Sequence, residues 1–143
     1  MQAPIFASIF SAVLLLSATV QAMEIRQFDK MAKADQDEYV ADLVLGAQKA
    51  LRGANQSDKA TQVRNLFVVI RPGDQISDGM AEFEIILAKT RLADAQRREK
   101  DPKVRPLEVE DAMAITLKRN GIKLPDSFFT VNANFRPKHP PKR

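Results

Sequence analysis

Apolar positions recur at helical spacing along most of the chain, and Gly and Pro separate the segments in which they do so. The first segment runs from Glu24 to Ala32 and holds apolar residues three apart. The second spans residues 34–53 and opens with acidic residues, which suit the partial positive charge of a helix N-terminus. Its apolar stripe comprises Tyr39, Val40, Leu43, Val44, Ala47 and Leu51. Both segments are predicted to be helices, and Gly53 is predicted to end the second in the left-handed conformation.

A third helical pattern begins at Ser57 and Asp58, which are typical residues at a helix start. Its apolar positions are Ala60, Val63, Leu66, Phe67 and Ile70. The β-branched run at residues 68–70 leaves a strand open as an alternative. The sequence Arg-Pro-Gly-Asp at residues 71–74 ends the element in either case.

The longest helical segment spans residues 77–100, with Ser77 as its predicted cap. Its first half is apolar in nearly every direction. One seam, spaced alternately four and three residues apart, comprises Ala81, Ile85, Ala88, Leu92 and Ala95. A second seam comprises Met80, Phe83 and Leu87. A helix that is apolar on several sides is surrounded by others, so this segment is predicted to be the central helix, with its polar second half projecting into water.

Two further elements complete the pattern. Glu108, Glu110 and Asp111 open a helix that ends with a glycine cap at Gly121, and its stripe comprises Val109, Ala112, Met113, Thr116 and Leu117. Residues 125–135 fit either a short helix, which we prefer, or a strand. The sequence therefore predicts an all-α protein, a single small bundle of five or six helices around the 77–100 helix, in a domain spanning residues 23–135.

The start of the chain has the pattern of a secretory signal peptide. Residues 4–22 carry no charged side chain, and residues 9–16 form an apolar core of the expected length. Small residues follow, and Val20-Gln21-Ala22 fits a signal-peptidase site, which predicts cleavage between Ala22 and Met23. An uncleaved membrane anchor is the alternative, because about 20 apolar residues can span a bilayer. We therefore expect export to the periplasm or the extracellular space, in a bacterium.

Composition limits the chemistry that the exported domain can perform. The chain has no Cys, so disulfides, thiol catalysis and thiolate metal sites are excluded. It carries 22 Lys and Arg against 18 Asp and Glu, a mild net charge of +4 that argues against nucleic acid as a partner. Stability must come from helix packing or from a partner. No cofactor or metal site is expected.

No motif in the sequence points to catalysis. The acidic groups at residues 35–38 and 108–111 lie where helix N-termini favour acids, and His139 is the only histidine. The Pro-rich tail at residues 136–143 is predicted to be extended, and its charge suits acidic surfaces. The tail residues that are candidates for surface binding are Arg136, Lys138, Lys142 and Arg143. Leu45 and Ile115 lie off their apolar stripes; we favour packing for both over a partner surface.

The stretch from Ile25 to Gly46 resembles the opening of small secreted helical proteins of the periplasm, namely acid-stress chaperones and immunity proteins that neutralise secreted toxins. The shared features are Phe28 and Met31, then Tyr39-Val40, then Gly46 within an apolar helix. Those families commonly carry a disulfide, whereas this chain has no Cys. The resemblance implies a helical fold and an envelope location.

Three hypotheses about function follow from the sequence. The first is a non-enzymatic envelope protein that binds another protein, as a chaperone or an inhibitor does. The second is an enzyme with a carboxylate or Lys site assembled across helices. The third is a module that associates with anionic surfaces through its basic tail, with the membrane as a partner only through this electrostatic association or the signal segment. The oligomeric state is left open.

Overall fold

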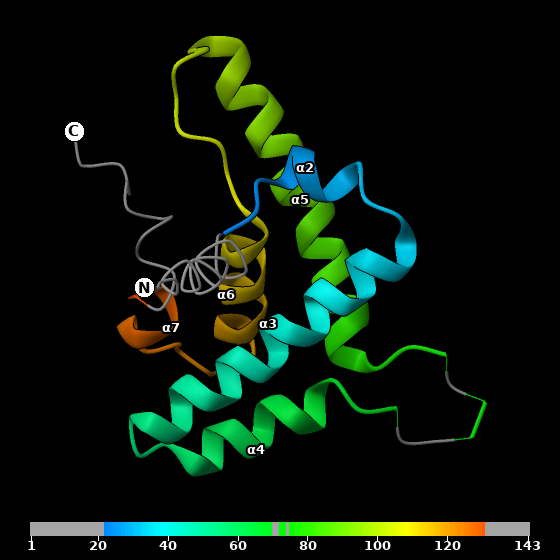
Figure 1. Cartoon of the computed structure of the whole chain (residues 1–143), viewed down its shortest axis with the longest axis vertical. Coiled ribbons are helices and arrows are strands. Elements are labelled where there is room, and N and C mark those ends of the chain that lie inside the picture. The colour runs from blue at the N-terminus through cyan, green and yellow to red at the C-terminus, as the bar shows by residue number, and fades with distance from the viewer. Residues whose placement is uncertain (1–21, 70–71, 74, 131–143) are drawn as a thin grey trace, which may run out of the picture.

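The computed structural model describes residues 22–69, 72–73 and 75–130, with the side chains of residues 129 and 130 outside the description. Six helices make up the regular structure of this part of the chain (Figure 1). They are α2 (Ile25–Asp29), α3 (Lys33–Gly53), α4 (Ser57–Leu66), α5 (Asp78–Lys100), α6 (Val109–Arg119) and α7 (Asp126–Thr130). An isolated bridge joins Glu24 to Glu108. The prediction of an all-α bundle is confirmed.

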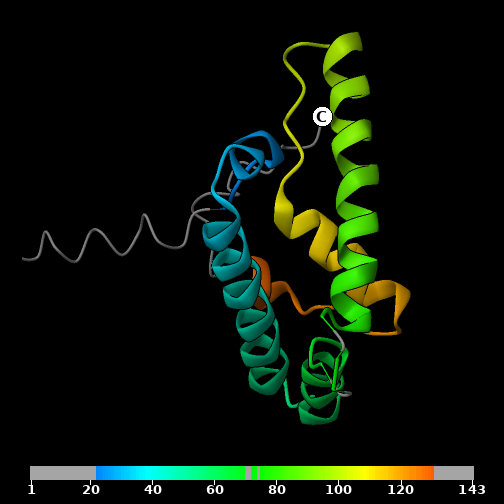
Figure 2. The same cartoon turned by 90° about the vertical axis from the view of Figure 1, so that its right-hand side faces the viewer.

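Two helix pairs organise the bundle. A short turn connects α3 to α4, and the two helices lie side by side as a hairpin, while α5 packs along α6 (Figure 1). Seen from the side, α3 and α5 form opposite flanks of the molecule, and α6 passes between them (Figure 2). The small helix α7 packs on α3.

The core draws apolar side chains from all six helices and from the α6–α7 connection. The stripes predicted for α3 and α6 are buried, with Tyr39 partly buried. The other buried apolar residues are Ile25, Phe28, Ala60, Val63, Phe83, Ile86, Leu87, Ile122, Leu124 and Phe128. Burial of this surface is the main favourable term in a fold that has no covalent cross-link.

The predicted helix caps at Ser77 and Gly121 are confirmed. The Ser77 hydroxyl accepts a hydrogen bond from the Met80 N–H at 3.1 Å and caps α5. Gly121 has a φ of 78°, and the N–H of buried Ile122 donates to the Leu117 carbonyl at 2.9 Å, which is the expected glycine cap of α6. The prediction for α3 is wrong by two residues: Gly53 stays helical, and Asn55 takes the left-handed conformation with a φ of 62°.

The segment after α4 forms neither the helix nor the strand that its sequence pattern allowed. The helix ends at Leu66, and the exposed residues Val68 and Val69 belong to neither a helix nor a strand. Gln56, not Ser57, is the N-cap residue of α4.

In the last element, α7 confirms the preference for a helix up to Thr130. The predicted continuation at residues 131–135 and the tail at 136–143 lie outside the described residues.

The longest helix is covered on one side only. α5 buries Phe83, Ile86 and Leu87, but Ile85 and Leu92 are 57% and 60% exposed. The expectation that neighbours surround this helix is therefore wrong for the seam that contains these two residues. α6 packs against the opposite face, and α5 runs along the edge of the molecule (Figure 2).

Candidate functional site

A groove of about 630 Å³ opens between α3, the segment after α4 and the first turns of α5. Val40 and Val44 of α3 form its buried lining, and partly buried Phe67 and Met80 extend it towards the other two elements. Because α4 ends at Leu66, the chain leaves the bundle at this point and leaves this side of α3 uncovered. The groove is thus a consequence of where α4 stops.

Several of the exposed residues that line the groove are also apolar. Leu45 is 61% exposed, and Val68, Val69 and Ile76 are exposed beside the same groove. Isolated apolar side chains on a surface need no explanation, but several around one groove make a patch that favours binding to another apolar surface. The expectation that Leu45 packs in a second layer is wrong, because α3 turns this position away from the core.

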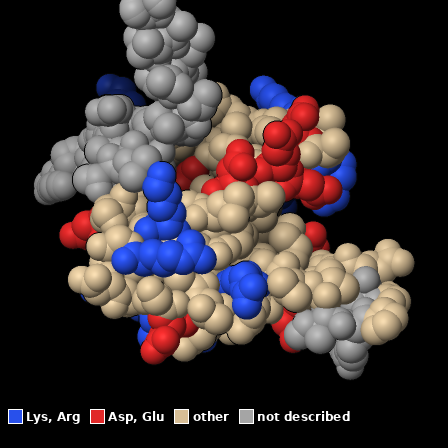
Figure 3. All heavy atoms as spheres, turned by 60° about the horizontal axis from the view of Figure 1, so that its bottom comes forward, with Lys and Arg blue, Asp and Glu red and all other residues tan. Residues whose placement is uncertain are grey.

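The charges around the groove balance one another. Lys33 and Asp37, one helical turn apart on α3, form an ion pair at 2.8 Å. The hydrogen bond from Lys33 to Asp37 raises the pKa of the lysine, and the nearby charge of Glu84 adds to this effect. Arg64 supplies the other basic side chain of the lining. At the α3–α4 end of the molecule, uncharged residues form most of the surface and charged side chains stand in separate groups (Figure 3).

A second, buried polar cluster lies where the start of the domain meets α6. The Glu110 side chain is 2% exposed; its carboxylate accepts hydrogen bonds from the Tyr39 hydroxyl and, at 3.2 Å, from the Met23 N–H. Burial raises the pKa of Tyr39, and the negative charge of Glu110 raises it further. Tyr39 therefore remains a protonated donor at every physiological pH.

Backbone hydrogen bonds hold the residues around the predicted cleavage junction against the start of α6. The Val109 N–H donates to the Met23 carbonyl at 2.9 Å, and the Ile25 N–H donates to the Leu107 carbonyl at 3.2 Å. Ala22 and Met23 are both partly buried. Met23, the residue directly after the predicted cut, thus lies beside Glu110.

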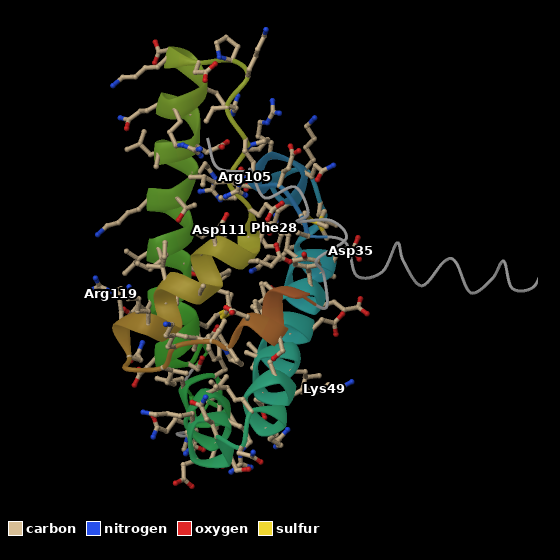
Figure 4. The ribbon with its side chains drawn as sticks, turned by 90° about the vertical axis from the view of Figure 1, so that its left-hand side faces the viewer. Phe28, Asp35, Lys49, Arg105, Asp111 and Arg119 are labelled. Carbon is tan, nitrogen blue, oxygen red and sulfur yellow. The ribbon has the colours of Figure 1, made fainter. Side chains whose placement is uncertain are left out.

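The acids at the start of α6 have two different roles. Glu108 and Asp111 form a capping box, in which the Asp111 carboxylate accepts the Glu108 N–H at 2.9 Å, and Arg105 lies 3.7 Å from Glu108 and 3.9 Å from Asp111. This confirms that acids open the helix. Arg105 and Asp111 lie at the same end of the molecule as Phe28 of α2 (Figure 4).

Glu110 lies at the predicted helix start, but its side chain is buried, which the prediction of acids at a helix N-terminus did not include. It precedes Met113 by three residues and Leu117 by seven, so helical spacing places it on the buried face of α6. This spacing is the signal in the sequence that could have identified it. Its partners could not have been identified in this way, because Tyr39 and Met23 are distant along the chain.

The second half of α5 is less exposed than its polar sequence predicts. Asp94 is 1% exposed and accepts hydrogen bonds from the Arg98 guanidinium at 3.0 Å and from the Leu107 N–H at 2.8 Å. The pairing of Asp94 with Arg98 is confirmed. Asp94 also anchors the linker between α5 and α6, a function that the local sequence does not indicate.

The remaining predicted residues stay separate from these two sites. The tail residues Arg136, Lys138, Lys142 and Arg143 lie outside the described part of the chain. Ile115 is exposed on α6, so its predicted packing is wrong. The described residues contain no group of three or more acidic or histidine side chains suited to a metal ion.

Within residues 22–69, 72–73 and 75–130, no helix combines the length and the apolar character that crossing a bilayer requires. No protein-family model, curated protein or solved structure shows significant similarity to this chain.

Proposed function

We propose that this chain is an exported, non-enzymatic protein of the cell envelope that binds an apolar segment of another protein in the groove beside α3. The observation that carries the proposal is the groove itself, where exposed Leu45, Val68 and Ile76 adjoin a buried apolar lining. Apolar grooves of this kind accept helices or extended segments whose own apolar side chains need burial. A chaperone and an inhibitor both bind partners in this way.

The length of the groove suits a short partner segment. Lining residues on α3 extend from Lys33 to Gln48, a distance of roughly 22 Å along the helix. That length accommodates about four turns of a partner helix or about six residues of an extended segment. The proposed occupant is therefore one amphipathic segment and not a whole domain surface.

The charge of the groove restricts the partner further. Lys33 and Asp37 neutralise each other, and Arg64 is offset by Glu84. A groove with balanced charge gives no long-range attraction to a strongly acidic or basic peptide. We therefore propose that the bound segment has little net charge and is recognised through its apolar side chains.

The surroundings of the buried carboxylates support a non-enzymatic role. Asp94 holds the α5–α6 linker, Glu108 caps α6, and Glu110 accepts from Tyr39 and Met23. A catalytic acid or base needs an open cleft in which it can reach a substrate. These side chains instead satisfy donors of the fold, so their burial has a structural reason.

The experiment compares a groove variant with a matched surface variant. The double substitution Leu45→Glu with Ile76→Glu adds charge to the groove, and Ile115→Glu adds it to exposed α6. All three positions are exposed, so we expect each variant to fold, which circular dichroism checks. Immobilised wild-type chain and the Ile115→Glu variant should retain one stoichiometric partner from an envelope extract, and the groove variant should lose it. Retention by the groove variant, or no partner for any chain, would contradict the proposal.

A further inference from the structure

The exposed seam of α5 has the spacing of a helix–helix contact. Its members are separated by four and three residues in turn, as in the seam of a coiled coil, and small and large side chains alternate along it. The seam comprises Ala81, Ile85, Ala88, Leu92 and Ala95, all exposed. The buried side of the helix holds Phe83, Ile86 and Leu87, so the seam plays no part in the core.

We propose that the seam binds the same seam of a second copy of this chain, with the two α5 helices antiparallel. In the register that aligns the seams, Ile85 faces Ala88 of the second copy, and Leu92 faces Ala81 of the second copy. Each layer then combines one large and one small side chain, which fills space evenly between the helices. A parallel pair would instead set Ile85 against Ile85 of the second copy and Ala88 against Ala88 of the second copy. Crowded and empty layers would then alternate along the contact.

The charges beside the seam match the same register. Glu84 and Arg91 flank one side of the seam, and Glu82 and Lys89 flank the other. In the antiparallel pair, Glu84 faces Arg91 of the second copy, and Glu82 faces Lys89 of the second copy. Opposite charges therefore face each other on both sides of the seam. Because the contact is symmetric, each of these pairs occurs twice.

Contacts within the chain hold two of these charged side chains in place. Arg91 donates to the Asp29 carboxylate at 2.7 and 2.8 Å, and Glu82 accepts from Arg119 at 2.7 Å and from Asn120 at 2.9 Å. The hydrogen bond from Arg119 lowers the pKa of Glu82, and Asn120 lowers it further. Glu82 is therefore ionised at neutral pH. The proposed self-association is separate from the proposed groove: Glu84 borders both, but none of the five apolar seam residues lines the groove.

The absence of Cys from the chain allows a direct test of the register. The Ile85→Cys variant is mixed with the Ala88→Cys variant under mild oxidation, and Leu45→Cys serves as an exposed control. We expect a disulfide that joins position 85 of one copy to position 88 of the other, while the control forms no intermolecular disulfide. Links of 85 to 85 and 88 to 88 would indicate a parallel pair and overturn the proposal.

Sedimentation of the cysteine-free chain, purified from an export host, provides the second readout. We expect a concentration-dependent dimer that Leu92→Lys converts to a monomer and that Leu45→Lys leaves intact. A wild-type chain that stays monomeric throughout the accessible concentration range would overturn the proposal. So would a dimer that Leu92→Lys does not weaken.

A different observation concerns Met23, the residue that cleavage after Ala22 would expose. Its backbone nitrogen lies 3.2 Å from Oε1 of the buried Glu110. We infer that cleavage converts this hydrogen bond into a buried ion pair that stabilises the mature fold, an inference that rests on the proposed export. The sequence pattern and the contact identify the same residue independently.

The chemistry of the cut supplies the charge. Hydrolysis by a signal peptidase consumes one water; Ala22 keeps the new carboxylate, and the Met23 nitrogen takes up protons to become an ammonium group. An uncharged amide with one N–H thus becomes a cation with three. A full positive charge on the donor adds a direct Coulomb attraction to the Glu110 carboxylate, which is stronger in the interior than in water.

The surroundings favour a cation at this position. Among the described residues, several acidic side chains lie where the start of the domain meets α6. The ionisable groups there are Glu24, Tyr39, Arg105, Glu108, Glu110 and Asp111. Tyr39 stays neutral because burial raises its pKa. An unblocked amino group has a pKa of about 7.7–8.0, and the Glu110 carboxylate is expected to raise it.

The test uses a double-mutant cycle on the secreted chain. Acetylation of Met23 removes the ammonium charge, and Glu110→Gln removes the carboxylate charge while preserving its shape. Acetylation should lower the folding equilibrium constant about tenfold or more at pH 6.5, and much less in the Glu110→Gln background. The stability difference between the free and the acetylated chain should be largest below about pH 7.7. It should disappear as the pH rises through the raised pKa of the amino group.

The outcomes separate this inference from the proposed export. A secreted product that does not begin at Met23 contradicts the predicted cleavage, and hence the inference that depends on it. A product that begins at Met23, but whose stability acetylation leaves unchanged or changes equally in both backgrounds, overturns the ion pair alone.

Discussion

A buried carboxylate is costly unless donors surround it, and Glu110 shows how this protein supplies them. One donor is the hydroxyl of Tyr39, the only tyrosine in the chain, and another is the backbone N–H of Met23. Tyr39 also packs its ring against Phe28, with ring centroids 6.1 Å apart and a tilt of 60°. The ring and the hydroxyl of Tyr39 therefore contribute to stability through separate contacts, and a substitution can distinguish the two contributions.

Tyr39→Phe should lower the free energy of unfolding by about 1–3 kcal/mol, because it keeps the ring and leaves a buried carboxylate short of one donor. Urea denaturation followed by circular dichroism measures the change. Lys33→Ala is the control: it breaks the exposed pair with Asp37 and should cost less than about 1 kcal/mol. Equal losses in the two variants would show that the hydroxyl contributes nothing specific.

At the scale of single helices, two glycines illustrate how the same residue type can have opposite roles. Gly46 lies within α3, and a β-carbon added there would meet Phe128 at an ordinary 3.8 Å. Gly79 lies in the first turn of α5, where an added β-carbon would come within 2.5 Å of the Leu66 carbonyl oxygen. The end of α4 and the start of α5 can approach each other only because Gly79 has no side chain.

Opposite effects on stability are therefore expected from one substitution at the two sites. Gly46→Ala should raise the free energy of unfolding by roughly 0.5–1 kcal/mol, since alanine favours a helix and meets no obstacle. Gly79→Ala should lower it by about 1–3 kcal/mol, because the two helices must move apart. Urea midpoints of both variants provide the comparison; a stabilised Gly79→Ala variant would mean that α4 and α5 do not touch as described.

At the scale of the whole molecule, the described residues leave two apolar surfaces outside the core, the groove and the seam, and these adjoin one another. The groove lies between α3 and the start of α5, and the seam follows the outer face of α5. Glu84 borders both, since it lines the groove and flanks the seam. The two proposed contacts therefore meet at Glu84.

The sequence by itself determined the helices and most of their ends. Periodicity placed the stripes of α3 and α6, Ser77 and Gly121 marked helix ends, and the lack of Cys meant that packing must stabilise the fold. These features depend on residues within a few positions of one another, where the spacing of a helix leaves few alternatives.

Only the tertiary structure decided which apolar faces are buried and which polar side chains enter the core. The sequence shows two apolar seams on α5, and the position of α6 decides that the one with Ile85 and Leu92 stays exposed. Glu110 and Asp94 are buried because donors distant along the chain or across a linker reach them. Local periodicity identifies the faces of a helix, whereas burial depends on which helices pack against those faces.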